Sequence, residues 1–200
     1  MNRVEDVVDM ALNAGLYVIL NEHWDDGWMN NPTYSQQAYI NNRLSIMWDQ
    51  IATNFRDYNY NLLFAGTNEV MMEGDYGTPT EEYYTVQNSF NQTFVDTVRA
   101  TGGNNVDRYL VVQNFNTNID HAVNFAVMPS DSASGRLMME IHYYDPYNFT
   151  LNATSNITQW GSIATDPSKT EDWAHESYCD SQFQKMKSNF VDQGIGVILG

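Results

Sequence analysis

Residues 61–69 read NLLFAGTNE, and this stretch decides the fold class. A short apolar run ends at Ala65 and is followed at once by Gly66 and polar residues, which is typical of a strand buried on both faces in a parallel sheet. Runs of the same character lie at 16–21, 109–113, 137–141 and 196–199. Longer stretches separate the runs and leave room for helices, so the sequence predicts an α/β protein with five parallel strands.

Helical periodicity fills the stretches between these runs. An acidic amphipathic helix is predicted over 1–14, ended by Gly15, and a helix over 81–100 is predicted to be capped by Thr80. Another helix is predicted over 171–190. A further helix is indicated by apolar residues spaced three and four apart, namely Ile40, Leu44, Met47, Trp48, Ile51 and Phe55. The alternation fits either a closed barrel or a doubly wound sheet.

Composition excludes several classes of function. The chain has 25 acidic against 9 basic residues and a formal charge of -16, which opposes binding to phosphate backbones, so no nucleic-acid partner is expected. Its apolar runs fall far short of the roughly 20 residues that span a bilayer, so no membrane partner is expected either. The same acidic balance favours a neutral or cationic ligand. Aromatic residues make up 14% of the chain, an unusually visible feature of its composition.

The loops that follow the strands are long and polar. In both parallel architectures ligands bind at the carboxyl ends of the strands, so the chemistry is expected in these loops. The Asn- and Thr-rich segment 148–160 is predicted to be a long loop that lies over the strand ends.

Polar side chains at these strand ends form the candidate site. Glu69 lies four residues after a strand, where a carboxyl group can act as a general acid if burial raises its pKa. His142 and Tyr144 follow another strand and, being two apart, point to the same side. His23 holds the matching place after the first strand, so a shared polar pocket with Asn68 is predicted. The alternative is that Glu69 is a solvated or helix-capping residue of a turn.

Aromatic residues crowd the same loops and suit stacking on sugar rings, although they could instead pack the loops or serve a protein partner. They are Trp24, Trp28, Tyr34, Tyr143, Tyr147 and Phe149, of which Trp28 and Tyr147 are predicted to bind substrate. Motifs of other enzyme classes are missing from the sequence, which has no G-x-S-x-G turn and no phosphate-binding loop. The four histidines show no metal-ligand spacing, so neither a metal nor another cofactor is predicted.

Three segments in order, 17–23 (YVILNEH), 63–69 (LFAGTNE) and 139–147 (MEIHYYDPY), together resemble the cellulases of glycoside hydrolase family 5. The resemblance extends over essentially the whole chain. It implies a (β/α)8 TIM barrel, here an incomplete piece that covers about the third to seventh strands, with residues 1–200 as a partial catalytic domain. It also implies retaining, endo-acting hydrolysis of β-1,4-glucan, meaning cellulose and possibly xyloglucan or mixed-linkage glucan.

The resemblance also assigns roles to five residues. Glu69 corresponds to the acid/base, and Asn68 to the residue that hydrogen-bonds the sugar 2-hydroxyl. His23 resembles the histidine that lines the subsite next to the cleaved bond. His142 and Tyr144 resemble a His-x-Tyr pair whose tyrosine hydroxyl is oriented toward the nucleophile.

The sequence departs from the family pattern in two respects. Val70 stands where the family usually has proline, which is a mild change of turn. Residues 196–200 match the seventh strand, and the family's nucleophilic glutamate is expected directly after it, outside the chain. The chain by itself is therefore expected to be inactive, and the parent protein is expected to be the enzyme.

Three interpretations follow from the sequence. The first is a parent β-glucanase, secreted or displayed on the cell surface because its polymeric substrate cannot enter a cell. The second is a non-catalytic glycan-binding or degenerate barrel, and the third is a structural protein that binds a partner through its acidic, aromatic surface. The oligomeric state is not predicted.

Overall fold

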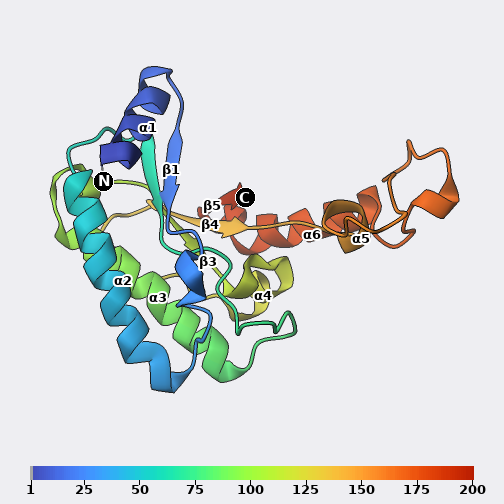
Figure 1. Ribbon diagram of the computed structural model, residues 1–200, viewed down its shortest axis with the longest axis horizontal. Helices are drawn as coiled ribbons and strands as arrows, with labels where there is room; N and C mark the ends of the chain where they lie inside the picture. Colours follow the sequence, from blue (N-terminus) through green and yellow to red (C-terminus); the bar gives the residue numbers. More distant parts are fainter. Residues whose placement is uncertain (1) are drawn as a thin grey trace.

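The computed structural model describes residues 2–200, and it consists of one parallel sheet with its helices (Figure 1). The strands are β1 (Val18–Asn21), β2 (Leu62–Ala65), β3 (Leu110–Gln113), β4 (Leu137–Ile141) and β5 (Gly196–Leu199). The α-helices are α1 (Asn2–Asn13), α2 (Tyr34–Asn54), α3 (Glu81–Ala100), α4 (Ile119–Phe125), α5 (Tyr147–Thr150) and α6 (Glu176–Asn189). The 3-10 helices are η1 (Asp25–Gly27), η2 (Gly103–Val106), η3 (Phe115–Thr117), η4 (Pro167–Lys169) and η5 (Val191–Gln193).

The strand order decides between the two parallel architectures. All neighbours pair in parallel, and their order in the sheet is β1-β2-β3-β4-β5, the same as their order in the sequence. A doubly wound sheet reverses direction at a switch point, whereas a barrel adds each strand beside the last. The prediction of an incomplete barrel is therefore confirmed.

The two faces of the strands pack against different partners. Leu62 and Phe64 of β2 belong to the large core shared with the helices, whereas Leu63 and Ala65 belong to a small cluster on the opposite, inner face. This alternation follows from the period of two in a strand. The large core therefore lies between sheet and helices, and the inner cluster corresponds to the interior of a barrel.

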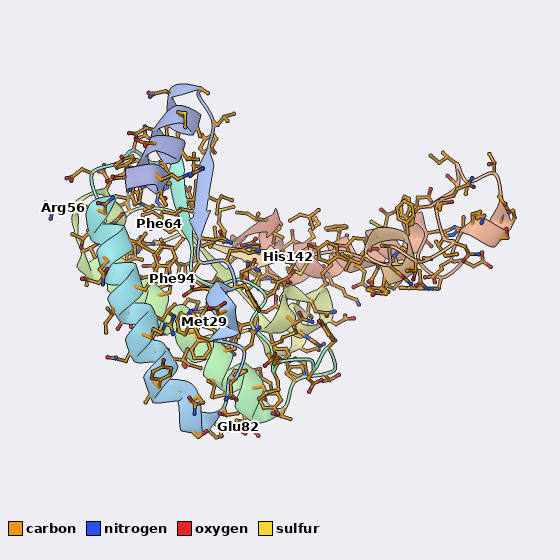
Figure 2. The ribbon with its side chains drawn as sticks, viewed as in Figure 1. Met29, Arg56, Phe64, Glu82, Phe94 and His142 are labelled. Carbon is orange, nitrogen blue, oxygen red and sulfur yellow. The ribbon has the colours of Figure 1, made fainter. Side chains whose placement is uncertain are left out.

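Trp48 of α2 is the centre of the helix-facing core. Its ring centroid lies 4.6 Å from that of Phe94 on α3 and 5.4 Å from that of Phe64, and the latter two rings lie between helices and sheet (Figure 2). Its indole nitrogen Nε1 donates a hydrogen bond to the Gly66 carbonyl at 3.0 Å. A Cβ atom on Gly66 would approach the Phe94 ring to 2.6 Å, so glycine is required where the strand turns toward the candidate site.

The strand predictions are accurate to within two residues, and the Thr80 cap is confirmed by a hydrogen bond from the Tyr83 backbone to its hydroxyl. Helix α6 begins at Glu176 instead of 171, because the preceding residues form turns. The short helices α4 and α5 were not predicted.

The predicted position of segment 148–160 is wrong for most of its length, although Leu151 near its start lines the cavity beside the strand ends. The segment between β4 and α6 extends away from the sheet instead of covering the strand ends (Figure 1). Several of its polar groups bond within the segment itself: Asn148 donates to Glu171 at 2.5 Å and the Thr158 backbone donates to the Lys169 carbonyl at 3.1 Å. Because these bonds close the segment on itself, it forms a projecting arm.

No helix within residues 2–200 is both long enough and apolar enough to cross a membrane.

Candidate active site

Glu69 is held at the carboxyl end of β2 by a strained backbone. Its φ angle is +49°, which is uncommon for a residue with a side chain and persists where the surroundings fix it. Its N–H donates to Oε1 of Gln113 on β3 at 2.8 Å. The Gln113 carbonyl in turn accepts from the side chains of Gln87 and Asn91 on α3, at 2.5 and 2.8 Å. The helix layer therefore fixes the backbone of Glu69 through Gln113.

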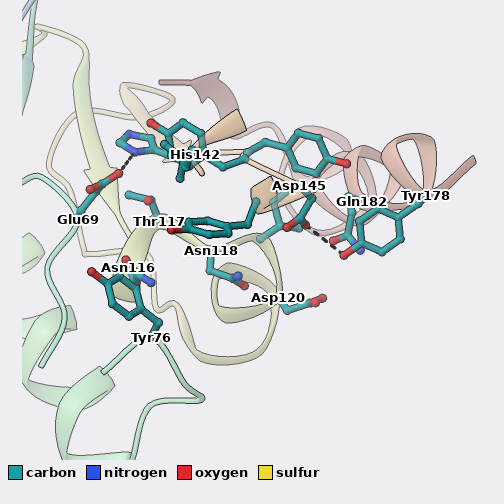
Figure 3. Close-up of a pocket in the computed structure, with 15 residues that line it drawn as sticks. Glu69, Tyr76, Asn116, Thr117, Asn118, Asp120, His142, Asp145, Tyr178 and Gln182 are labelled. Carbon is teal, nitrogen blue, oxygen red and sulfur yellow. Dashed lines mark hydrogen bonds and ion pairs between the residues drawn. The ribbon is translucent and has the colours of Figure 1, made fainter. Parts of the chain in front are cut away.

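The Glu69 carboxylate contacts His142, which follows β4. Oε1 of Glu69 lies 2.5 Å from Nδ1 of His142 (Figure 3). Nε2 of the same ring lies 3.3 Å from Oε1 of Glu140. The His142 side chain is 9% exposed, whereas that of Glu69 is 40% exposed. One imidazole thus joins two carboxylates, and only Glu69 is open to a ligand.

The pair shares one proton, and that proton belongs to the imidazole. Burial lowers the pKa of His142, but the hydrogen bonds and charges of Glu140 and Glu69 outweigh it and raise the pKa to about 9. The hydrogen bond from His142 lowers the pKa of Glu69, against the opposing effect of burial. At neutral pH the pair is therefore imidazolium and carboxylate. The condition set for a general acid, a pKa raised by burial, is not met in the resting pair, because the hydrogen bond from His142 outweighs the effect of burial on the pKa of Glu69.

The structure brings some of the predicted residues together. A cavity of about 640 Å³ is lined by Glu69, His142, Tyr144 and Tyr147, together with residues that the sequence did not indicate (Figure 3). The His142 and Tyr144 rings meet edge to face with centroids 6.1 Å apart, as expected for residues on the same side of the chain. The volume lies within the range of about 300–1,000 Å³ that is usual for ligand sites.

Other predicted residues lie outside this cavity. His23 contacts the Asn21 side chain at 3.4 Å, and its charge makes a minor contribution to lowering the pKa of Glu69. Asn68 is buried beside Glu69. Trp28 packs under the guanidinium of Arg43, whose central carbon lies 4.4 Å from the ring centroid. The substrate roles of these residues stay predictions.

The part of the cavity wall that follows β3 was not predicted from the sequence. Asn116 and Thr117 after β3 both have positive φ angles, 53° and 49°, and both line the cavity. Such strain in two consecutive residues with side chains marks a loop that its surroundings hold in place. The Thr117 carbonyl accepts a hydrogen bond from the His142 backbone at 3.0 Å, so this loop also positions the histidine. In the sequence, the only signal for these two residues is their position in a polar loop that follows a strand.

No group of three or more metal-ligating side chains occurs in the part of the chain that the structure describes.

Comparison with known proteins gives a consistent result. The family described as Cellulase (glycosyl hydrolase family 5) matches residues 1–200. The chain is 44% identical to an endoglucanase A of Paenibacillus barcinonensis and 52% identical to a xyloglucan-specific endo-beta-1,4-glucanase of Bacteroides ovatus. These matches cover 100% of the chain but 54% and 40% of the two relatives, so the chain spans about half the length of the curated relatives that it matches.

Solved structures are similar over the same extent. A Bacteroides ovatus GH5 xyloglucanase in complex with a XXXG heptasaccharide superposes with a TM-score of 0.94 at 43% identity, and covers 100% of this chain and 43% of that one. A family 5 xyloglucanase from Paenibacillus pabuli in complex with ligand gives a TM-score of 0.94 at 44% identity, with 100% and 59% covered.

Proposed function

Because this chain belongs to glycosyl hydrolase family 5, we propose that the protein containing it is an endo-acting glycosidase that cleaves β-1,4-linked glucans with retention of configuration. In this proposal Glu69 is the acid/base residue. The observation that carries it is the 2.5 Å contact between Glu69 and His142 at the carboxyl ends of two strands of a barrel-type sheet. Ligands of such barrels bind at this end of the strands.

The proposed chemistry uses the Glu69 carboxyl group twice, first as an acid and then as a base. In the first step Glu69 donates a proton to the leaving glycosidic oxygen while a second carboxylate attacks the anomeric carbon, so the C–O bond breaks and a glycosyl-enzyme ester forms. In the second step Glu69 takes a proton from water, whose oxygen attacks the same carbon and releases the sugar. Because the pair rests as carboxylate and imidazolium, the first step requires the proton to move from Nδ1 of His142 to Oε1 of Glu69.

The second carboxylate has a suitable place at the end of β5. A Cβ atom built on Gly200 would lie 2.6 Å from Nε2 of His142, so the backbone after β5 runs beside the Glu69–His142 pair. A glutamate that directly follows this strand, where the family resemblance places the nucleophile, would lie on the same edge of the sheet as Glu69. This supports two carboxylates flanking one bond, as the retaining mechanism requires.

The substrate is proposed from the walls of the cavity and from the relatives. Tyr144 and Tyr147 are 41% and 59% exposed, so their rings are free to contact the apolar face of a sugar. The relatives are named as endoglucanases and xyloglucanases. We therefore propose β-glucan as the partner, with xyloglucan and mixed-linkage glucan as the substrates to test first, and a secreted or cell-surface location, because a polymer cannot enter a cell.

The test is Glu69→Gln in the protein expressed from its complete reading frame. Hydrolysis of xyloglucan and mixed-linkage glucan should fall by about 10²–10⁴, the usual contribution of general acid–base catalysis. Glu73→Gln is the matched control, because Glu73 is an exposed glutamate of the same loop, and its activity should equal that of the wild type. Full activity of Glu69→Gln would contradict the assignment.

Binding measurements on the same two proteins distinguish the proposed enzyme from the alternative, a non-catalytic glycan-binding barrel. Affinity electrophoresis in gels that contain either glucan measures binding without hydrolysis. A wild-type protein that is retarded in these gels but releases no reducing sugar would favour the binding module. Retardation of both the wild type and Glu69→Gln, with hydrolysis by the wild type alone, would favour the enzyme.

A further inference from the structure

Two polar side chains interrupt the apolar inner face of the sheet. Gln113 on β3 and Glu140 on β4 are register partners. Each comes two residues after a member of the inner apolar cluster, Val111 and Met138 respectively, so both side chains point to the interior of the barrel. They are 0% and 9% exposed, although barrel interiors are usually filled by branched apolar side chains.

Each of these side chains contacts one member of the Glu69–His142 pair. Oε1 of Gln113 accepts the Glu69 N–H at 2.8 Å. Oε1 of Glu140 lies 3.3 Å from Nε2 of His142. Within the pair, Nδ1 of His142 lies 2.5 Å from Oε1 of Glu69 (Figure 3). A chain of three hydrogen bonds therefore begins at Gln113 and ends at Glu140.

The two ends of this chain each keep one unpaired atom. Nε2 of Gln113 and Oε2 of Glu140 are buried and have no hydrogen-bond partner among residues 2–200. The first is a donor and the second an acceptor. The Gln113 amide cannot be turned over, because its oxygen is needed by the Glu69 N–H. Neighbouring strands lie about 4.7–4.9 Å apart, so register partners on one face are within reach of each other.

We propose that these two atoms bond to each other, and that Gln113 and Glu140 act together as positioning residues of the acid/base. The bond closes a ring of hydrogen bonds, which we call the positioning ring, and its members are Glu69, Gln113, Glu140 and His142. It removes the free-energy cost of two unpaired buried groups at once. The proposal rests on the proposed function, because it takes Glu69 as the acid/base.

The positioning ring acts on Glu69 in two ways. Gln113 holds the Glu69 backbone at its unusual φ of +49°, and the Gln113 carbonyl is itself anchored by two side chains of α3. Burial disfavours a charge on His142, and the hydrogen bond to Glu140 is the largest of the effects that oppose it. Gln113 thus determines where the carboxyl group stands, and Glu140 determines the pH at which the pair loses its proton.

The charges around the imidazole come from three elements. Glu140 belongs to β4 and Glu69 follows β2, and both act on His142 directly. His23 follows β1 and acts on Glu69. Gln113 on β3 is neutral, and β5 carries no titratable side chain. Removal of the Glu140 charge is therefore expected to make the proton of the pair easier to lose.

The first arm of the test measures hydrolysis of xyloglucan by the complete protein. Gln113→Met keeps a side chain of similar length but removes the amide. Because the Glu69 carboxyl group then loses its fixed position, kcat should fall by about 10–100-fold while KM changes by less than about twofold. Gln193→Met is the matched control, because Gln193 is an exposed glutamine that precedes β5, at the opposite end of the strands. It should keep the wild-type kcat.

The second arm needs no substrate, because it follows the titration of the His142 ring by nuclear magnetic resonance. The signal is identified by its loss in His142→Gln. Its midpoint is expected near pH 9 in the wild type, and Glu140→Gln should lower it by at least about one pH unit. Glu73→Gln, a change at an exposed glutamate, is the matched control and should leave the midpoint unchanged. Glu140→Gln preserves the shape of the side chain, so this arm stays decisive if other variants fold poorly.

The third arm tests the bond between Gln113 and Glu140 by urea unfolding. Gln113→Met and Glu140→Met are measured singly and together. If the two side chains bond to each other, the second substitution removes a bond that the first has already broken. The urea midpoint of the double variant should then fall by less than the sum of the two single losses.

Three results would overturn the proposal. They are a wild-type kcat in Gln113→Met, an unmoved His142 titration in Glu140→Gln, and additive losses of the urea midpoint. A wild-type protein that hydrolyses no glucan would instead contradict the proposed function. The titration and the urea midpoints are measured without substrate, so they would still decide whether the positioning ring exists.

Discussion

The Glu69–His142 pair makes stability depend on pH, and the substitution His142→Gln isolates this effect. Glutamine can still hydrogen-bond Glu69 but does not titrate. Because the pKa of His142 is raised from 6.5 to about 9 in the folded protein, the folded state keeps a proton that the unfolded chain releases between these values. The stabilisation is therefore complete below pH 6.5 and is lost as the pH rises through about 9.

The magnitude follows from the size of this difference. Raising a pKa from 6.5 to about 9 corresponds to about 3.4 kcal/mol at 1.36 kcal/mol per unit. The Glu69 side chain is 40% exposed, and solvent screens its interaction with the imidazolium, so we expect about 2 kcal/mol.

The assay is urea unfolding of the complete wild-type and His142→Gln proteins, followed by tryptophan fluorescence. From about pH 6 to about pH 10 the wild type should lose about 2 kcal/mol more unfolding free energy than the variant. Every group that titrates equally in both proteins cancels in this comparison. Parallel pH dependences, or a wild type that gains stability relative to the variant, would refute the assignment of the proton to His142.

Two further predictions concern buried charges outside the pair. Burial and the nearby charge of Asp25 raise the pKa of Glu22 to about 7, so the folded state holds a proton between pH 4.5 and about 7 and its stability falls as the pH rises through that window. Glu22→Gln should therefore raise the unfolding free energy by about 1–2 kcal/mol near pH 8 and change it little near pH 4, and an equal effect at both pH values would contradict this reasoning. Arg99 makes two 2.8 Å bonds to Asp131, and the two side chains are 7% and 5% exposed. Arg99→Met should cost about 3–5 kcal/mol in urea unfolding because Asp131 is left buried and unpaired, and partial recovery in a double variant with Asp131→Leu should confirm that cause.

The sequence predicted the sheet well because its strands are short apolar runs with clear ends. The runs ending at Ala65, Gln113 and Ile141 all stop where β2, β3 and β4 stop. Sequence alone could not choose between a barrel and a doubly wound sheet without the family resemblance, because both alternate strands and helices. The observed strand order settles that choice. The arm after β4 was misplaced because its polar residues bond to one another, and composition does not reveal the partners of a side chain.

The candidate site was predictable in its members but not in its electrostatics. Glu69 and His142 were both identified from their positions after strands, and they are in contact. That their contact lowers the pKa of Glu69 follows from a distance across 73 residues of sequence, which no local pattern contains. Glu140 was missed as the second partner of His142, although a charged residue inside an apolar strand was a signal that could have found it.

The end of the cavity that is formed by α4 and α6 was not predicted from the sequence. Tyr178 and Gln182 lie on a helix whose own sequence shows only weak amphipathic character, and Asp120 lies on a short helix that the sequence did not indicate. Their convergence depends on how α4 and α6 pack against each other, which is a tertiary property.

The most direct test of the central claim, that Glu69 is the acid, compares leaving groups. The first turnover of Glu69→Gln is measured in the complete protein on xyloglucan and on a dinitrophenyl β-cellobioside, whose leaving group departs without a proton. If Glu69 donates the proton, the first turnover should fall by about 10²–10⁴ on xyloglucan and remain near the wild-type rate on the activated substrate. An equal fall on both substrates would contradict the account, because the role of Glu69 would then not depend on the proton that the leaving oxygen needs.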